Sequence, residues 1–173
     1  EVLERNRVKI STIFSYSRET LFDHSLRDIL PLLREKGVGL LNAAPTGMGL
    51  LVPQGPPDWH PASDAIKAAC HKAAQYCKAR EVDIARLALR TAIENEELPT
   101  TFISAAKVEF IKQNIEAATT PLSDKEKECR GHIVAEFLKP LQDANNTHWE
   151  GVELRQYWEE VGKTLLLQNH YGR

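Results

Sequence analysis

The segment from Val38 to Trp59 constrains the fold of this chain more than any other. It begins as a short apolar run after a Lys-Gly helix stop and opens, through small residues, into a loop rich in glycine and proline. A short apolar run bounded by turn signals is typical of a buried parallel strand. Ligands of α/β sheets bind at the carboxyl ends of such strands, so we expect any binding site where this strand ends. The small residues there either admit a flat or phosphorylated ligand or simply form a tight bend beneath a helix.

Composition and charge exclude several classes of protein. With 173 residues, of which 42% are hydrophobic and 27% charged, the chain has the apolar content of one core. The formal net charge is −2 and the basic residues are dispersed, which predicts no nucleic-acid partner and no membrane partner. Three cysteines without CxxC spacing favour reduced thiols and a cytoplasmic location. The first residues of the sequence resemble the end of a helix, and we interpret this as the sign of a fragment or truncated product.

Hydrophobic periodicity divides the chain into alternating strands and helices. The first long helix is expected to take Asp23 or Ser25 as its N-cap, to start late or kink at Pro31, and to stop at Gly37. Ser63 and Asp64 predict the start of another helix, and the Ser123-to-Glu126 capping box predicts a third. The strands are expected at 8–15, 38–44 and 100–104, the last two buried, and the helices at 2–7, 26–33, 64–76, 84–93, 108–115, 124–137 and around Leu154 to Val161.

This order of elements indicates repeated βα units and therefore a parallel sheet. Three strands cannot close a (β/α)8 barrel, which takes roughly 250 residues, so about five units would be missing from one. An open three-stranded sheet is the competing arrangement, and it would leave long apolar edges.

Residue patterns alone predict no catalytic or metal site. Cys70, His71 and Cys77 have helical spacing, but His71 points away from the two cysteines, so core packing is the better interpretation. Asp23, His24 and Ser25 are consecutive and diverge around a helix start, which excludes a hydrolytic triad. The turn from Pro45 to Gly49 lacks the Gly-Lys-Ser/Thr of a phosphate-binding P-loop.

A resemblance to a known family adds a specific expectation. The sequence GVGLLNAAPTGMGLLVPQGPPDWHPAS, residues 37–63, closely resembles the seventh strand and following loop of aldo-keto reductases, particularly the L-galactose dehydrogenase-like branch. TIFSYSRETLFDHSLRDILPLLREKG and FISAAKVEFIKQNIEAA resemble the sixth and eighth βα units. The resemblance implies that residues 1–145 form the C-terminal part of a (β/α)8 TIM barrel, an α/β fold, with 146–173 as a C-terminal helical tail. It also implies an NADP or NAD cofactor and hydride transfer to or from a small carbonyl or sugar substrate.

The same resemblance suggests cofactor-binding residues position by position. Ala44, Pro45 and Thr46, with Met48 in the same loop, correspond to the segment that lines the cofactor pyrophosphate. Ser15 aligns with a glutamine that often bonds the nicotinamide amide, and Ala43 with a tyrosine that often stacks on the nicotinamide. Phe110 replaces an Arg or Gln, which leaves the choice between NADP and NAD open. Asn114 corresponds to the asparagine that contacts the adenine. Ser104, Ala105 and Lys107 correspond to the loop around the 2′-phosphate of the adenosine.

The family's catalytic tetrad of Asp, Tyr, Lys and His lies on its first four strands, and no segment here matches that region. We therefore assign no catalytic residue and expect the chain to supply the cofactor-binding part of an oxidoreductase, to expose apolar strand edges, and to be poorly active alone. The alternatives are a non-catalytic nucleotide-binding or regulatory protein on an incomplete barrel, whose tail with Trp149, Tyr157 and Trp158 binds a partner, or a gene product without a role. The sequence does not indicate the oligomeric state.

Overall fold

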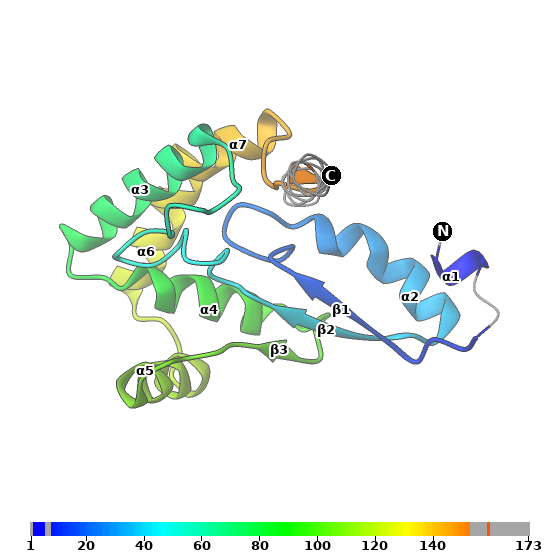
Figure 1. The fold of residues 1–173 in the computed structure, drawn as a ribbon. Helices are drawn as coiled ribbons and strands as arrows, with labels where there is room; N and C mark the ends of the chain where they lie inside the picture. Colours follow the sequence, from blue (N-terminus) through cyan, green and yellow to red (C-terminus); the bar gives the residue numbers. More distant parts are fainter. Residues whose placement is uncertain (1, 6–7, 153–158, 160–173) are drawn as a thin grey trace, which may run out of the picture.

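The computed structural model describes residues 2–5, 8–152 and 159, and Figure 1 shows their arrangement. The elements follow one another as α1 (Val2–Arg5), β1 (Thr12–Tyr16), η1 (Ser25–Ile29), α2 (Leu30–Lys36), β2 (Gly39–Ala43), α3 (Asp64–Lys78), α4 (Ile84–Glu94), β3 (Thr101–Phe102), α5 (Val108–Thr119), α6 (Asp124–Ile133), η2 (Val134–Leu138) and α7 (Lys139–Asp143). No helix among the described residues is long and apolar enough to cross a membrane.

The strands form a parallel three-stranded sheet in the order β1-β2-β3, as the βα pattern predicted. Thr12 pairs with Gly39 and Tyr16 with Ala43, so β1 and β2 are in register over their full lengths. The pairing of β2 with β3 is short and joins Asn42 to Thr101 and Ala43 to Phe102. All three strands therefore end at the same edge of the sheet, where ligands of α/β proteins bind.

Two strand predictions were wrong in extent. The first strand starts at Thr12, and Val8 lies outside it with 72% of its surface exposed. The third was expected to be a buried strand over 100–104, but only Thr101 and Phe102 pair, and Phe102 is 51% exposed. β3 lies at an edge of the sheet, and no described element covers the face to which its phenylalanine belongs.

The first long helix is divided into two parts. Ser25–Ile29 forms a 3₁₀ turn and α2 begins at Leu30, so Pro31 falls in the first helical turn, where a missing N–H costs no hydrogen bond. Neither Asp23 nor Ser25 is an N-cap, since η1 is preceded by His24 and α2 by Ile29. Asp23 instead accepts the Ser25 backbone N–H at 2.8 Å within the turn before η1.

Three predicted helix boundaries agree with the structure. Gly37 ends α2 in the left-handed conformation at φ 62°. Ser63 caps α3 by accepting the Ile66 N–H, and Ser123 with Glu126 forms the predicted capping box of α6. The helix expected over 108–115 continues to Thr119, and the one expected over 124–137 ends at Ile133 and is followed by the π turn η2. The predicted helix around Leu154 to Val161 lies outside the described residues apart from Glu159.

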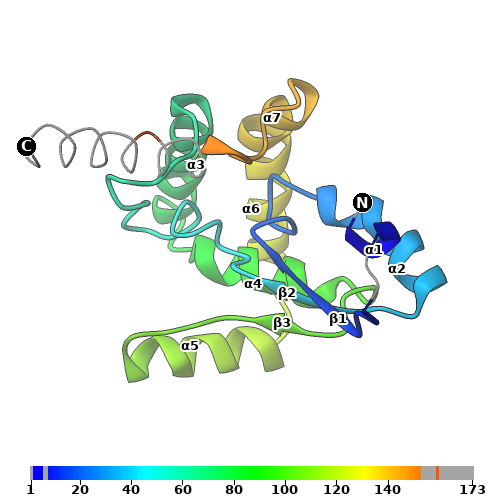
Figure 2. The ribbon, with the colours of Figure 1, turned by 45° about the vertical axis from the view of Figure 1, so that its right-hand side comes forward.

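Two hydrophobic clusters lie at opposite ends of the molecule (Figures 1 and 2). The smaller packs α2 against the sheet through Leu30, Leu33 and Leu40. The larger is enclosed by α3, α4, α6 and the loops after β1 and β2, and its fully buried members include Phe22, Ile66, Leu87 and Ile133.

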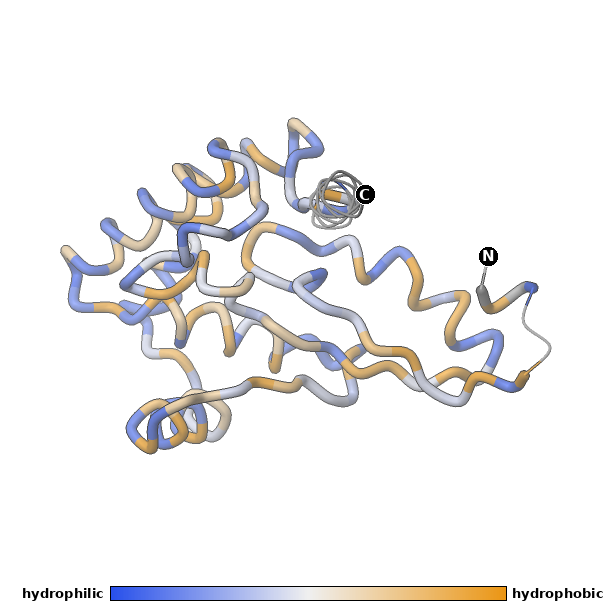
Figure 3. Tube along the Cα trace, viewed as in Figure 1, coloured by the Kyte–Doolittle hydropathy of each residue, from blue (hydrophilic) through white to orange (hydrophobic). Residues whose placement is uncertain are grey.

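The opposite face of the sheet carries exposed aromatic residues. Phe14, Tyr16 and Phe102 are each more than half exposed, and the Phe14 ring lies 5.9 Å from that of Phe102. Helix α5 also exposes apolar side chains to solvent. Its predicted apolar stripe is present, but Val108, Ile111 and Ile115 are exposed, and Ala117 is its buried residue. Figure 3 shows that α5, which Figure 1 labels, carries both hydrophobic and hydrophilic positions around its axis.

Candidate functional site

A cavity of about 580 Å³ opens at the carboxyl end of the sheet. Four segments form its wall: the loop after β2, the start of α4, the residues after β3, and α5. Its lining consists of Thr46, Val52, Pro53, Gln54, Asp83, Ala85, Arg86, Ile103, Ser104, Phe110, Gln113, Asn114 and Ala117. A mostly apolar hollow with a few polar groups is typical of a small-molecule site.

The turn after β2 sets the shape of one wall. Ala44 and Met48 adopt left-handed φ values of 54° and 56°, which are unusual for residues with a side chain. Gly47 has a φ of 61°, and a Cβ there would lie 3.2 Å from the ring of Phe22. Gly47 is therefore small because the turn packs tightly against Phe22. Tight packing is one of the two explanations that the sequence left open for the small residues here, the other being the approach of a ligand.

His60 fixes this turn from beneath. It is buried, and its Nδ1 accepts the backbone N–H of Ala62 at 3.1 Å. The proton must then be on Nε2, which donates to the Gly47 carbonyl at 3.1 Å. His60 is therefore a buried residue whose two ring nitrogens hold the loop in place.

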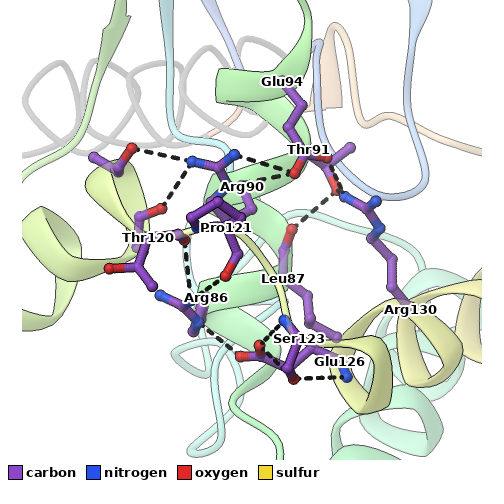
Figure 4. A network of polar contacts seen from close by, with 12 residues as sticks. Arg86, Leu87, Arg90, Thr91, Glu94, Thr120, Pro121, Ser123, Glu126 and Arg130 are labelled. Atoms are coloured by element: carbon purple, nitrogen blue, oxygen red, sulfur yellow. Dashed lines mark hydrogen bonds and ion pairs between the residues drawn. The ribbon is translucent and has the colours of Figure 1, made fainter.

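Arg86 forms part of the cavity wall and is held on several sides (Figure 4). Its Nε donates to Glu126 at 2.7 Å, and its Nη2 donates to the backbone carbonyls of Thr120 and Pro121 at 3.1 and 3.2 Å. The third nitrogen, Nη1, is buried without a hydrogen-bond partner. The Arg86 side chain is 16% exposed. The cavity therefore borders a guanidinium group whose Nε and Nη2 already donate hydrogen bonds within the protein.

Glu126 holds that guanidinium as an anion. Burial acts to raise the pKa of Glu126, but hydrogen bonds from the Ser123 backbone and hydroxyl, together with Arg86, hold it below its ordinary value. The same pattern recurs at the end of α4, where burial acts to raise the pKa of Glu94 but Arg130 and Arg90 hold it below its ordinary value. These two networks connect α4 to α6 behind the cavity.

The charged residues of the cavity lining are Asp83 and Arg86. Asp83 is the N-cap of α4 and accepts the Ala85 N–H at 2.9 Å. Lys107 is not part of the lining; its ammonium lies 5.9 Å above the centre of the Phe110 ring. The cavity thus offers aromatic and amide surface, which suits a flat heteroaromatic ring better than a bare anion.

The structure brings only some of the residues predicted for the site together. Thr46, Ser104 and Asn114 line the same cavity although they come from three distant segments. Ala44 and Pro45 belong to the adjoining turn, and Ala105 and Lys107 follow Ser104 without lining the cavity. Ser15 and Met48 line two separate hollows, of about 520 and 310 Å³, near the carboxyl end of β1.

Four polar lining residues were missed by sequence reasoning: Gln54, Asp83, Arg86 and Gln113. Asp83 precedes an apolar helical pattern and was recognisable as an N-cap. The role of Arg86 depends on partners up to 40 residues away in sequence, and no local signal indicates it.

No group of His, Cys, Asp and Glu side chains within the described ranges could hold a metal ion. Cys70, Cys77 and Cys129 are free and buried, in agreement with the core-packing interpretation of Cys70 and Cys77.

Comparison with known proteins identifies the family. The model of the aldo/keto reductase family matches residues 5–129. The chain belongs to the aldo/keto reductase family. L-galactose dehydrogenase of Arabidopsis thaliana is 39% identical over 142 residues, which cover 80% of this chain and 44% of that protein. The chain therefore spans less than half the length of this relative.

Solved structures of the family have been found with similar coverage. The holo form of the aldo-keto reductase AKR11C1 from Bacillus halodurans gives a TM-score of 0.48 at 21% identity, over 76% of this chain and 44% of that chain. Glycerol dehydrogenase AKR11B4 from Gluconobacter oxydans gives 0.47 at 19% identity, over 73% and 43%.

Proposed function

We propose that this chain forms the cofactor-binding part of an NAD(P)-dependent aldo-keto reductase. The complete protein would transfer hydride between the nicotinamide and a small carbonyl or sugar substrate. The observation that carries the proposal is the convergence of Thr46, Ser104 and Asn114 on one cavity at the carboxyl end of the parallel sheet. Family membership supports hydride transfer as the class of reaction, and the lining of the cavity supports the binding of a nucleotide cofactor.

The cavity would hold the adenosine end of the cofactor. Phe110 and Ile103 offer apolar surface against which a purine can pack, and the amides of Asn114 and Gln113 offer both donors and acceptors for its edge. Ser104 and Thr46, which line the same cavity, would contact the ribose and phosphate oxygens. Ala105 and Lys107 would then face the 2′-position of the ribose.

The rest of the cofactor would extend across the end of the sheet. Ala44, Pro45 and Met48 border the turn after β2, where backbone groups would line the pyrophosphate. Ser15, near the end of β1, would meet the nicotinamide. Met48 and Ser15 line separate hollows of about 310 and 520 Å³, in which this part of the cofactor would lie.

Catalysis would require groups outside this chain. The open aromatic sheet face of Phe14, Tyr16 and Phe102 supports an assignment of residues 1–145 to the C-terminal part of a barrel, with 146–173 as its tail. We accordingly assign no catalytic residue here and expect negligible turnover by this chain alone. The free, buried cysteines favour a reducing, cytoplasmic compartment.

Fluorescence titration of the purified chain with NADH and NADPH tests this proposal. Asn114→Ala should weaken binding by about tenfold, because a lost hydrogen bond in a partly enclosed site costs about 1–1.5 kcal/mol. Gln75→Ala is the matched control, since Gln75 is an exposed helical amide on α3 outside the cavity, and it should leave binding unchanged. Failure of the folded chain to bind either nucleotide, or equal binding by Asn114→Ala, would contradict the proposal.

A second candidate is a non-catalytic nucleotide-binding or interaction protein. It is favoured by the exposed apolar stripe of α5 and the exposed aromatic sheet face, which suit a protein partner. The same chain would then bind nucleotide without turnover even when combined with the remaining βα units of a family member. Recovery of hydride transfer on combination supports the enzyme instead.

A further inference from the structure

Two of the buried thiols lie in contact across the larger hydrophobic cluster. Cys77 is near the end of α3 and Cys129 is in α6, 52 residues later in the sequence. Their sulfur atoms are 3.5 Å apart, and each residue is at most 2% exposed. Figure 2 shows the two helices side by side.

We propose that Cys77 and Cys129 form an intramolecular disulfide on oxidation, which links α3 to α6. A disulfide bond is about 2.05 Å long, so the two sulfur atoms must approach by about 1.5 Å. Small side-chain rotations supply such a movement, because the helices are already packed against each other. The third cysteine cannot compete: Cys70 is two turns before Cys77 on the same helix, about 10 Å away along its axis.

The reaction with hydrogen peroxide is one two-electron oxidation that proceeds in two steps. One thiol loses its proton, and the resulting thiolate attacks a peroxide oxygen. The O–O bond breaks, a sulfenic acid forms, and the hydroxide that leaves takes up the thiol's proton to become water. The second thiol attacks the sulfenyl sulfur, the S–O bond breaks, and the disulfide forms with loss of a second water. In total two thiols and one peroxide yield one disulfide and two waters.

Burial determines the rate of this reaction. It raises the pKa of Cys77, and the adjacent Cys129 thiol raises it further, so little thiolate is present at neutral pH. Peroxide also reaches the sulfurs only when the contact between α3 and α6 opens. The cross-link therefore forms slowly in the native protein, and its rate increases with pH and with low concentrations of urea.

The bond would strengthen one wall of the cavity. Cys129 lies one turn after Glu126, whose carboxylate holds Arg86. A link that closes a loop of this length reduces the entropy of the unfolded chain, so the midpoint of thermal unfolding should increase by about 10 °C. Addition of dithiothreitol should reverse the increase.

Peptide mapping of the peroxide-treated full chain tests the proposal. After alkylation and digestion without reductant, we expect a Cys77–Cys129 linked peptide, lighter than the two free peptides by two hydrogen atoms, and an alkylated Cys70. Cys70→Ala is the matched control and should retain the link, whereas Cys77→Ala and Cys129→Ala should lose it.

The measurement on the unsubstituted chain decides the question even if a variant fails to fold. Three alkylated cysteines after prolonged treatment in low urea would overturn the proposal. So would a link that contains Cys70, or one between two molecules.

Discussion

The helical end of this molecule and its open sheet face differ in how completely they are packed. Around α3, α4 and α6, Ile66, Leu87 and Ile133 are fully buried, and ion pairs join α4 to α6. Across the sheet face and along α5, residues of the same chemistry, such as Phe14 and Ile115, are more than half exposed. Hydrophobic patterning thus places side chains on one face of an element, but only a second element buries them. The cavity lies where these two regions meet.

The largest expected effect contrasts two isoleucines. Ile133→Ala in α6 should lower the free energy of unfolding by about 3 kcal/mol, because it opens a cavity at a fully buried position. Ile115→Ala in α5, where the side chain is 58% exposed, should change it by less than about 0.5 kcal/mol. Urea denaturation followed by circular dichroism gives both values. Equal losses would show that the packing contrast is wrong.

Removal of the ion pair between Glu126 and Arg86 should have an intermediate effect on the free energy of unfolding. Glu126→Gln removes the carboxylate that Arg86 and the capping box share, and should destabilise the chain by about 1–2 kcal/mol. Asp143→Asn, which affects an exposed pair with Lys139, is the control and should have little effect.

The same carboxylate predicts a pH dependence. The folded-state pKa of Glu126 is lowered below 4.5, so its contribution is complete above about pH 4.5 and is lost as the pH falls through the folded pKa. Unfolding midpoints measured from pH 6 downward should therefore decrease more steeply for the unsubstituted chain than for Glu126→Gln. Parallel curves would contradict the role given to this group.

The smallest expected effect concerns the nucleotide. Lys107→Gln should weaken NADPH binding by about threefold and leave NADH binding unchanged, because an exposed ammonium contributes less than about 1 kcal/mol to a phosphate contact. Competition titration with both nucleotides measures the difference. An equal loss for both would mean that Lys107 supports the fold of the segment and not the 2′-position.

Much of the fold could be predicted because it depends on local signals. The capping box at Ser123, the glycine stop at Gly37 and the βα order all act within a few residues, and each is found in the structure. The errors arose where long-range contacts decide. The predicted burial of Phe102 required a covering element that no described segment provides. Pro31, in contrast, lies in the first turn of a helix that starts late, which is one of the two outcomes expected for it.

The candidate site was predictable only in part. Family resemblance indicated Thr46, Ser104 and Asn114, which do line one cavity, but gave no sign of Arg86. That side chain owes its position to Glu126 and to two backbone carbonyls in a later loop. Periodicity places Arg86 on α4, whereas its contacts follow from tertiary packing.

The most direct test of the account compares the two halves of the cofactor. Isothermal titration calorimetry of the chain with ADP-ribose and with nicotinamide mononucleotide separates the adenosine end from the nicotinamide end. We expect saturable binding of ADP-ribose that Asn114→Ala weakens, and much weaker binding of the mononucleotide. Binding of nicotinamide mononucleotide without ADP-ribose, or of neither by the folded chain, would contradict the assignment of the cavity.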